Sequence, residues 1–204
     1  MTVPPKPKFT KEEITQAALE LVSEKGMASL TARDLGARLG SSARPVFTVF
    51  QSMEEVQRQV RDAAMERLRG FIATAPENLP PFKRVGIGML GFAVREPKLY
   101  QLLFMTECDT AGGFDGLFER LGIMALDAVK LLQEEYGLSE PIARTVFEQT
   151  WIYTFGVGAL CATRTAVFSE AEMSQMLSTA FAGALFTATF DAPLDRFVQS
   201  KLKK

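Results

Sequence analysis

The sequence predicts an all-α protein, and three observations support that fold class. At four points a Ser or Thr stands three residues before an acid and directly before an apolar helical pattern, which is the spacing of a capping box: Thr10/Glu13, Thr31/Asp34, Ser52/Glu55 and Ser169/Glu172. Apolar residues then recur at helical spacing along one face. No alternating strand pattern bounded by hairpin turns occurs. We therefore expect helices throughout.

The amino-terminal region is expected to hold one ordinary helix and two short ones. The first has an apolar stripe from Ile14 to Val22 and ends at Gly26. The second covers about residues 32–39. The third is expected to begin after Ser42, with Pro45 in its first turn, where the missing N–H of proline costs little. Helices this short are marginal alone, so they must pack on each other and on a neighbour.

The rest of the chain is expected to form a fourth helix from residue 52 to about 71 and then a larger helical body. The stretch "TAPENLPPFKR" separates the two parts because its prolines break helical structure. Further helices are expected at about residues 82–95, 97–106, 114–136, 140–167 and 170–190. We expect a head at 1–51, a connecting helix at 52–75 and a body at 76–204.

Composition argues against catalysis and against a generally basic protein. The formal net charge is -1, so an anionic partner must be met by a local basic patch. The chain has no histidine, which removes the commonest general base and every Ser-His or Cys-His dyad. Cys108 and Cys161 lack metal-ligand spacing, and we interpret them as small apolar side chains in a reducing compartment. We expect no enzyme activity, no metal and no cofactor.

Neither the amino terminus nor the longest apolar run suggests export or a membrane span. The amino terminus "MTVPPKPKF" has no apolar signal-peptide core. The longest apolar run, "WIYTFGVGALCAT", is shorter than the roughly 18 to 20 residues that span a bilayer. The sequence therefore predicts a cytoplasmic protein.

The second and third helices have the pattern of a helix-turn-helix, in which the amino-terminal residues of the second helix read base edges in the major groove. Here those residues are Ser42, Ala43, Arg44, Pro45 and Thr48. Arg44 can donate two hydrogen bonds to guanine, and the Ala43, Pro45 or Thr48 carbons can contact a thymine methyl group. Thr31 and Arg33, at the start of the second helix, are candidates for phosphate contacts. The alternative is that Arg44 is a solvated surface residue and that Pro45 only starts a helix.

These residues resemble the TetR family of bacterial transcriptional regulators. The resemblance covers about residues 9–71 and rests on "LTARDLGARLG" and "SSARPVFTVFQSMEEV". It implies a DNA-binding head and a larger helical body that dimerises and binds a small-molecule inducer. Two positions depart from the family pattern: Phe47 replaces a tyrosine that meets phosphate, and Met53 replaces a lysine. Because both departures remove a contact to the DNA backbone, we expect Lys8 to contact phosphate together with Thr31, Arg33, Arg44 and Thr48.

Small residues form stripes on the last two expected helices, both of which are apolar on more than one face. One stripe contains Ile152, Gly156, Ala159 and Thr163, and the other contains Met176, Ala180, Gly183 and Thr187. A four-helix packing of two helices from each subunit would bury both stripes, which predicts a homodimer. Burial within one subunit is the alternative.

Large side chains of the body are candidates to line a cavity for an apolar or aromatic ligand. They are Met89, Phe92, Tyr100, Phe104, Phe118, Met124, Trp151, Tyr153 and Phe155. Trp151 and Tyr153 are favoured because each has a polar atom. The alternative is that each of the nine belongs to an ordinary core.

The function that these features favour is a ligand-responsive DNA-binding regulator, a repressor, acting as a homodimer on double-stranded DNA. Two-fold symmetry predicts a pseudo-palindromic operator with half-site centres about 34 to 36 Å apart, or a multiple of that distance. One alternative is a helical enzyme that uses paired acids such as Glu134 and Glu135, although consecutive helical residues diverge. The other is a ligand-binding or partner protein whose head no longer binds DNA specifically.

Overall fold

The computed structural model describes residues 7–107 and 112–189, and in this part of the chain it contains helices and no strand. The fold class is therefore all-α, as predicted. The order of elements is α1 Lys11–Lys25, η1 Met27–Ser29, α2 Ala32–Arg38, η2 Val46–Thr48, α3 Met53–Ala73, α4 Pro81–Arg95, α5 Pro97–Phe104, α6 Gly113–Leu121, α7 Ile123–Tyr136, α8 Glu140–Ala162 and α9 Glu170–Thr189. None of these helices is long and apolar enough to cross a membrane.

The capping signals in the sequence mark real helix starts. Thr10 accepts a hydrogen bond from the Glu13 backbone N–H, and the Glu13 carboxylate accepts one from the Thr10 N–H at 2.8 Å. Ser169 and Glu172 make the same reciprocal pair before α9. Each pair satisfies two backbone donors that a helix start would otherwise leave without a partner.

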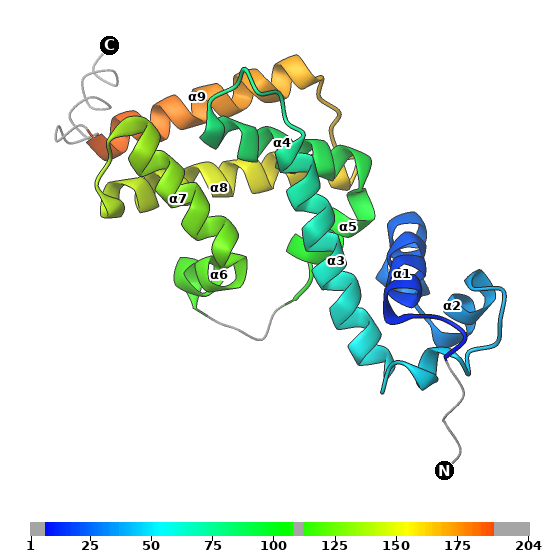
Figure 1. The fold of residues 1–204 in the computed structure, drawn as a ribbon. Coiled ribbons are helices and arrows are strands. Elements are labelled where there is room, and N and C mark those ends of the chain that lie inside the picture. The colour runs from blue at the N-terminus through cyan, green and yellow to red at the C-terminus, as the bar shows by residue number, and fades with distance from the viewer. Residues whose placement is uncertain (1–6, 108–111, 190–204) are drawn as a thin grey trace.

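The head packs around apolar side chains from α1, α2 and η2. Ile14, Val22 and Leu35 are fully buried, and Val46 and Phe50 close the cluster from the segment after α2. The long helix α3 then leaves the head and runs to the body (Figure 1). These head residues belong to the same apolar cluster as the body core, so the two parts share a continuous interior.

Helix α8 lies at the centre of the body and packs against α4, α5, α7 and α9. Helix α4 joins this bundle to α3 at very close range: a Cβ added to Gly88 would lie 2.5 Å from the Ile72 Cα atom. A side chain at position 88 would therefore separate the two helices. Helix α3 also packs against α1, so α4 is connected to the head through α3.

Two of the predicted body helices differ in the structure. The helix expected at 114–136 is broken into α6 and α7 at Gly122, whose φ of 53° lies in the left-handed region. The helix expected at 140–167 ends at Ala162, because the chain reverses at Arg164, where φ is 57°. The backbone N–H groups of Thr165 and Ala166 both reach back to the Leu160 carbonyl at this end.

The third head helix is also shorter than predicted. Instead of a helix beginning after Ser42, the chain makes a turn and then the single 3-10 turn η2. Pro45 has no N–H to donate to residue 41, and β-branched Val46, Thr48 and Val49 disfavour a regular helix. The N–H groups of Thr48 and Val49 bond carbonyls three residues back, at 3.2 Å each.

Candidate nucleic-acid interface and ligand pocket

The segment from residue 41 to residue 50, called the recognition turn below, presents polar side chains outward from a buried anchor. Val46 and Phe50 point into the head core and are 0% and 1% exposed. Four residues of this segment are exposed, namely Ser42, Arg44, Phe47 and Thr48. Two others, Ala43 and Pro45, are half-buried. The structure thus brings the residues predicted to read DNA onto one short surface segment.

The recognition turn sits directly on α2 because residue 36 is glycine. A Cβ added to Gly36 would lie 2.7 Å from the Ser42 carbonyl carbon and 2.8 Å from the Ala43 nitrogen. The Ser41 N–H donates to the Gly36 carbonyl at 2.9 Å. The glycine therefore fixes the spacing between the two parts of the helix-turn-helix.

Three predicted DNA-contacting cations have no acid beside them. Among the described residues, no carboxylate lies within 4.0 Å of the charged groups of Lys8, Arg33 and Arg44. By contrast, Arg38 of the same head pairs with Glu24 at 2.7 Å. Lys8 donates to the Ser41 hydroxyl at 3.2 Å, which places its ammonium group beside the recognition turn. Positive charge at this surface is free to meet phosphate.

Three other positions of the head differ in what surrounds them. The Thr31 hydroxyl caps α2 and donates to the Asp34 carboxylate at 2.6 Å, so it is already engaged. Phe47 is 47% exposed, which is unusual for a phenylalanine and places its ring on the predicted DNA surface. Met53 is half-buried and packs against the core at the start of α3.

A pocket of about 240 Å³, called the α4–α9 pocket below, lies in the body between the start of α4, the end of α7, and α8 and α9. Six of the fourteen lining residues have aromatic or sulfur-containing side chains: Phe82, Met89, Tyr136, Phe147, Trp151 and Phe181. Burial, and secondarily the Glu135 carboxylate, raises the pKa of Tyr136 to about 12, so the phenol is neutral at physiological pH. The hydroxyls of Thr150 and Thr154 donate to carbonyls of their own helix at 2.7 Å.

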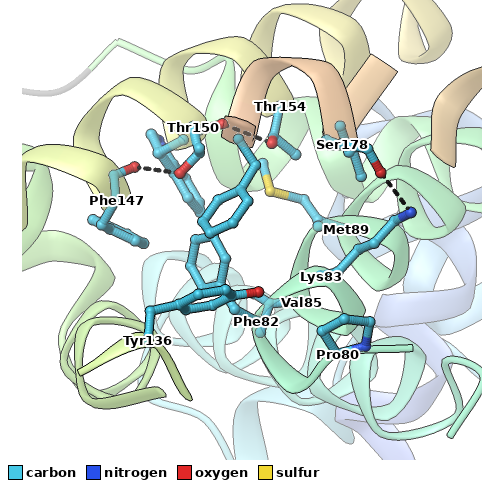
Figure 2. A pocket seen from close by; sticks show the side chains of 14 residues that line it. Pro80, Phe82, Lys83, Val85, Met89, Tyr136, Phe147, Thr150, Thr154 and Ser178 are labelled. Carbon is cyan, nitrogen blue, oxygen red and sulfur yellow. Dashed lines mark hydrogen bonds between the residues drawn. The ribbon is translucent and has the colours of Figure 1, made fainter. Parts of the chain in front are cut away.

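One side of this pocket is polar. The Lys83 ammonium group donates to the Ser178 hydroxyl at 2.8 Å, and Figure 2 shows this pair on the opposite side of the pocket from Tyr136 and Phe147. The pocket is therefore amphipathic, with a cationic end and an aromatic end.

Comparison with known proteins agrees with this architecture. Residues 14–60 match the family model described as bacterial regulatory proteins, tetR family. The amino-terminal region of the chain is therefore of the TetR type. No curated protein matches the sequence.

Solved structures of TetR-type proteins share the fold at low sequence identity. A TetR-like transcriptional regulator from Rhodococcus sp. RHA1 is similar with a TM-score of 0.58 and 16% identity, over 90% of this chain and 98% of that one. A TetR family member from Streptomyces coelicolor A3 has a TM-score of 0.60 and 14% identity, over 86% and 98%. FadR from Thermus thermophilus, a TetR family transcriptional repressor in complex with lauroyl-CoA, has a TM-score of 0.50 and 20% identity, over 89% and 97%.

Only two of the nine predicted ligand-contacting residues line the pocket, namely Met89 and Trp151. The other seven lie elsewhere. Phe92, Tyr100, Phe104 and Phe155 belong to or pack against the core, with Tyr100 donating to the Phe155 carbonyl at 3.1 Å. Phe118 and Met124 pack against the core from α6 and α7, and Tyr153 is 38% exposed.

Sequence reasoning missed most of the pocket. Phe82, Lys83, Tyr136, Phe147, Ser178 and Phe181 come from four helices that are distant in sequence. A signal was available for two of them, since Lys83 and Tyr136 are polar residues at the ends of apolar helices. Which helix ends meet in space depends on the packing of the bundle.

The small-residue stripes on α8 and α9 lie largely on the outside of the single chain. Ile152 is 60% exposed, and a Cβ added to Gly156 or to Gly183 would meet nothing within 4 Å. Thr163 and Thr187 are exposed, whereas Ala159, Met176 and Ala180 are half-buried. The Thr187 hydroxyl lies 3.4 Å from the Gln149 amide oxygen, so the two helices run antiparallel and the stripes share one face.

A second hollow, of about 650 Å³, lies where α3, α4 and the start of α9 meet. Its lining includes Arg95 and Glu170, which face each other at 3.8 Å. The charges of this hollow are thus balanced internally, unlike the single cation of the α4–α9 pocket.

The sequence singles out two paired acids and two cysteines, and the structure shows the contacts of Glu134, Glu135 and Cys161. Glu134 pairs with Lys130 at 3.6 Å, while Glu135 accepts the backbone N–H of Phe82 at 3.1 Å. The two carboxylates thus bind different partners and do not face one another. Cys161 is buried, and burial raises the pKa of its thiol. Cys108 lies outside the described residues.

Proposed function

We propose that this chain is a TetR-family transcriptional repressor that binds a pseudo-palindromic operator as a homodimer and is released by a small apolar or aromatic effector. The observation that carries the proposal is the exposed recognition turn, which holds Arg44 without an acidic neighbour on a buried anchor of Val46 and Phe50. This arrangement suits a rigid reading surface for DNA.

In this proposal the recognition turn enters the major groove. Arg44 donates to guanine, and Ser42, Ala43, Pro45, Phe47 and Thr48 line the base edges and the nearby backbone. Lys8 and Arg33 meet phosphate oxygens, and the α2 amino terminus capped by Thr31 adds backbone N–H groups. We also propose that residues 1–51 act as the DNA-binding unit, that 52–75 connect it and that 76–204 hold the effector and the dimer contact.

The dimer contact is proposed on the shared outer face of α8 and α9. Ile152 and the open surfaces at Gly156 and Gly183 would leave an apolar, nearly smooth face in water if the chain were alone. A second copy can approach such a face closely and bury all eight stripe residues in a four-helix packing.

The effector is proposed to occupy the α4–α9 pocket. Its aromatic walls suit an apolar or aromatic molecule, and its volume, slightly below the roughly 300 Å³ at which small-molecule pockets usually begin, favours a small one. That the similar FadR structure holds lauroyl-CoA supports a ligand-bound body in this chain as well.

Selection of genomic DNA fragments by the purified full-length protein tests the proposal. We expect recovery of a two-fold symmetric site that survives excess competitor DNA, and footprinting should give two protected half-sites with affinity that falls as salt rises. Binding without sequence preference, or no binding, would favour the alternative of a ligand-binding or partner protein whose head no longer binds DNA specifically.

A further inference from the structure

We propose that the effector is an organic anion, a small carboxylic acid whose carboxylate binds at Lys83 and Ser178 and whose apolar body lies among the aromatic side chains. This inference rests on the proposed function for its regulatory meaning, but the ligand class follows from the pocket alone. The pocket has one charged group, and that group is a cation.

The polar end of the pocket offers donors and no carboxylate. The Lys83 ammonium group has three N–H donors and gives one to Ser178. Because Ser178 accepts that bond, its own O–H can point to a ligand. Among the described residues, no carboxylate lies within 4.0 Å of the Lys83 nitrogen. Two adjacent donors, one of them charged, match the two oxygens of one carboxylate.

The nearest acid along the chain does not oppose an anion at this place. Glu135 precedes Tyr136, but its carboxylate accepts the Phe82 N–H at the start of α4 and is not part of the pocket wall. At that position it compensates the positive end of the α4 dipole. A cationic ligand would find no carboxylate in the wall and would meet Lys83, so the pocket disfavours amines.

The other polar groups of the pocket wall offer a ligand few hydrogen-bond donors. Thr150 and Thr154 have already given their hydroxyl hydrogens to carbonyls of α8. Tyr136 contributes a neutral ring that packs on Phe181 at 4.9 Å between centroids. The pocket has a single lysine and no arginine fork, so it suits a monoanion better than a phosphate.

The only tryptophan of the chain, Trp151, lines the pocket and supplies the readout. The full-length protein is titrated with 4-phenylbutyrate, 4-phenylbutanol and 4-phenylbutylamine, and with octanoate, octanol and octylamine, while Trp151 fluorescence is followed. Within each series the apolar body is constant and only the head group changes. We expect at least one acid to bind about tenfold or more tightly than its alcohol, and the amine to bind most weakly.

Variants assign that preference to Lys83. Lys83→Met keeps most of the side-chain length and should reduce acid binding about tenfold, to the level of the alcohol, without changing alcohol binding. Ser178→Ala should weaken acid binding alone by a smaller factor, and it serves if the first variant fails to fold. Lys130→Met, on the exposed surface of α7, is the matched control and should change nothing.

Several results would overturn the proposal: acid and alcohol of equal affinity, equal weakening of both by Lys83→Met, or no saturable signal from any of the six compounds. DNA-binding measurements distinguish failure of the ligand proposal from failure of the proposed function. If the acid binds but the protein does not bind DNA, or if the acid leaves DNA binding unchanged, the ligand class stands and the regulatory role does not.

Discussion

Arg44 is exposed and has no acidic neighbour among the described residues, and the lack of an acid distinguishes it from Arg38 of the same head. Arg38, six residues earlier, is held by Glu24 through two hydrogen bonds of 2.8 and 2.7 Å. A guanidinium group already paired in this way gains little from DNA. Substitutions of Arg44 and Arg38 can therefore be compared to test which arginine contacts the operator.

Arg44→Ala should cost about 1 to 3 kcal/mol of operator binding and relax discrimination at one base pair in each half-site, because a bidentate contact to guanine is lost. Titration of the operator and of a scrambled duplex measures both effects. Arg38→Ala should leave both affinities nearly unchanged. Equal losses on operator and scrambled DNA would make Arg44 a phosphate contact instead.

Phe47→Tyr should strengthen binding by about 0.5 to 1.5 kcal/mol, since the ring is exposed on the predicted DNA surface and gains a donor for phosphate. The new hydroxyl is neutral, so the slope of log K against log salt should stay the same. Titrations at several salt concentrations measure both quantities. If affinity is unchanged, Phe47 does not face the backbone in the family's docking pose.

The residues of the recognition turn could be chosen from sequence because spacing within one short segment fixes which of them share a surface. The pocket could not be chosen in this way. Phe147 and Phe181 lie on different helices, and their meeting with Tyr136 depends on how α7, α8 and α9 pack. Helical periodicity predicts that Tyr100 and Phe92 face inward, and both are buried. It cannot predict whether an inward-facing side chain packs in a filled core or lines a cavity.

At the scale of elements, α4 connects the pocket to the head. Its first residues, including Phe82 and Lys83, line the pocket, and its carboxyl end leads into Glu96. The Glu96 carboxylate accepts the Ser23 hydroxyl of α1 at 2.5 Å and the Arg67 guanidinium of α3 at 2.9 Å. One helix thus touches the effector site at one end and the head at the other.

Glu96→Gln should lower the free energy of unfolding by about 1 to 3 kcal/mol, because Arg67 and Glu96 are only 22% and 16% exposed and their hydrogen bond carries charge. Urea denaturation measures the change, with an unaltered slope indicating an unaltered denatured state. The control is Glu66→Gln, whose partner Arg69 is a surface residue, and it should change stability by little. Equal effects would mean that the Glu96 contact does not join head and body.

Helix starts were predictable because a capping box is a local signal, whereas breaks inside helices depend on more than local composition. Gly122 lies in an apolar helical pattern that continues on both sides, and only the packing of α6 and α7 separates them. The recognition turn differs from a regular helix for a reason that the sequence does contain, namely Pro45 followed by β-branched residues. The same proline is also compatible with the first turn of a helix, which is why the sequence predicts a helix there.

At the scale of the whole molecule, assembly should depend on the open face at Gly183. Gly183→Leu adds a large side chain where the single chain has nothing within 4 Å, so the subunit should fold normally and the proposed dimer should dissociate. Sedimentation gives the mass, and circular dichroism checks the helices. Gly70→Leu adds the same side chain at an equally open position on α3 and should leave the dimer intact. A dimer that survives the change at Gly183 would move the interface elsewhere.

Stability should change little between about pH 6 and 8, because the chain contains no histidine. The pKa of Glu24 is lowered by Arg38, and the pKa of Glu172 is lowered by the Ser169 N–H. A lowered carboxyl pKa stabilises the fold above the unfolded value of about 4.5, and this contribution is lost as the pH falls through the folded value. Urea midpoints at pH 4, 6 and 8 should therefore be equal at the two higher values and lower at pH 4.

The close contact at Gly36 has a genetic consequence. Any side chain at this position would push the recognition turn off α2, while the body, which holds the proposed dimer face, would be untouched. Subunits altered at this position would then pair with normal subunits in the same cell and give mixed dimers with one intact head. In the proposed repressor such dimers would contact a single half-site, so one defective allele is expected to relieve repression even when a normal copy of the gene is present.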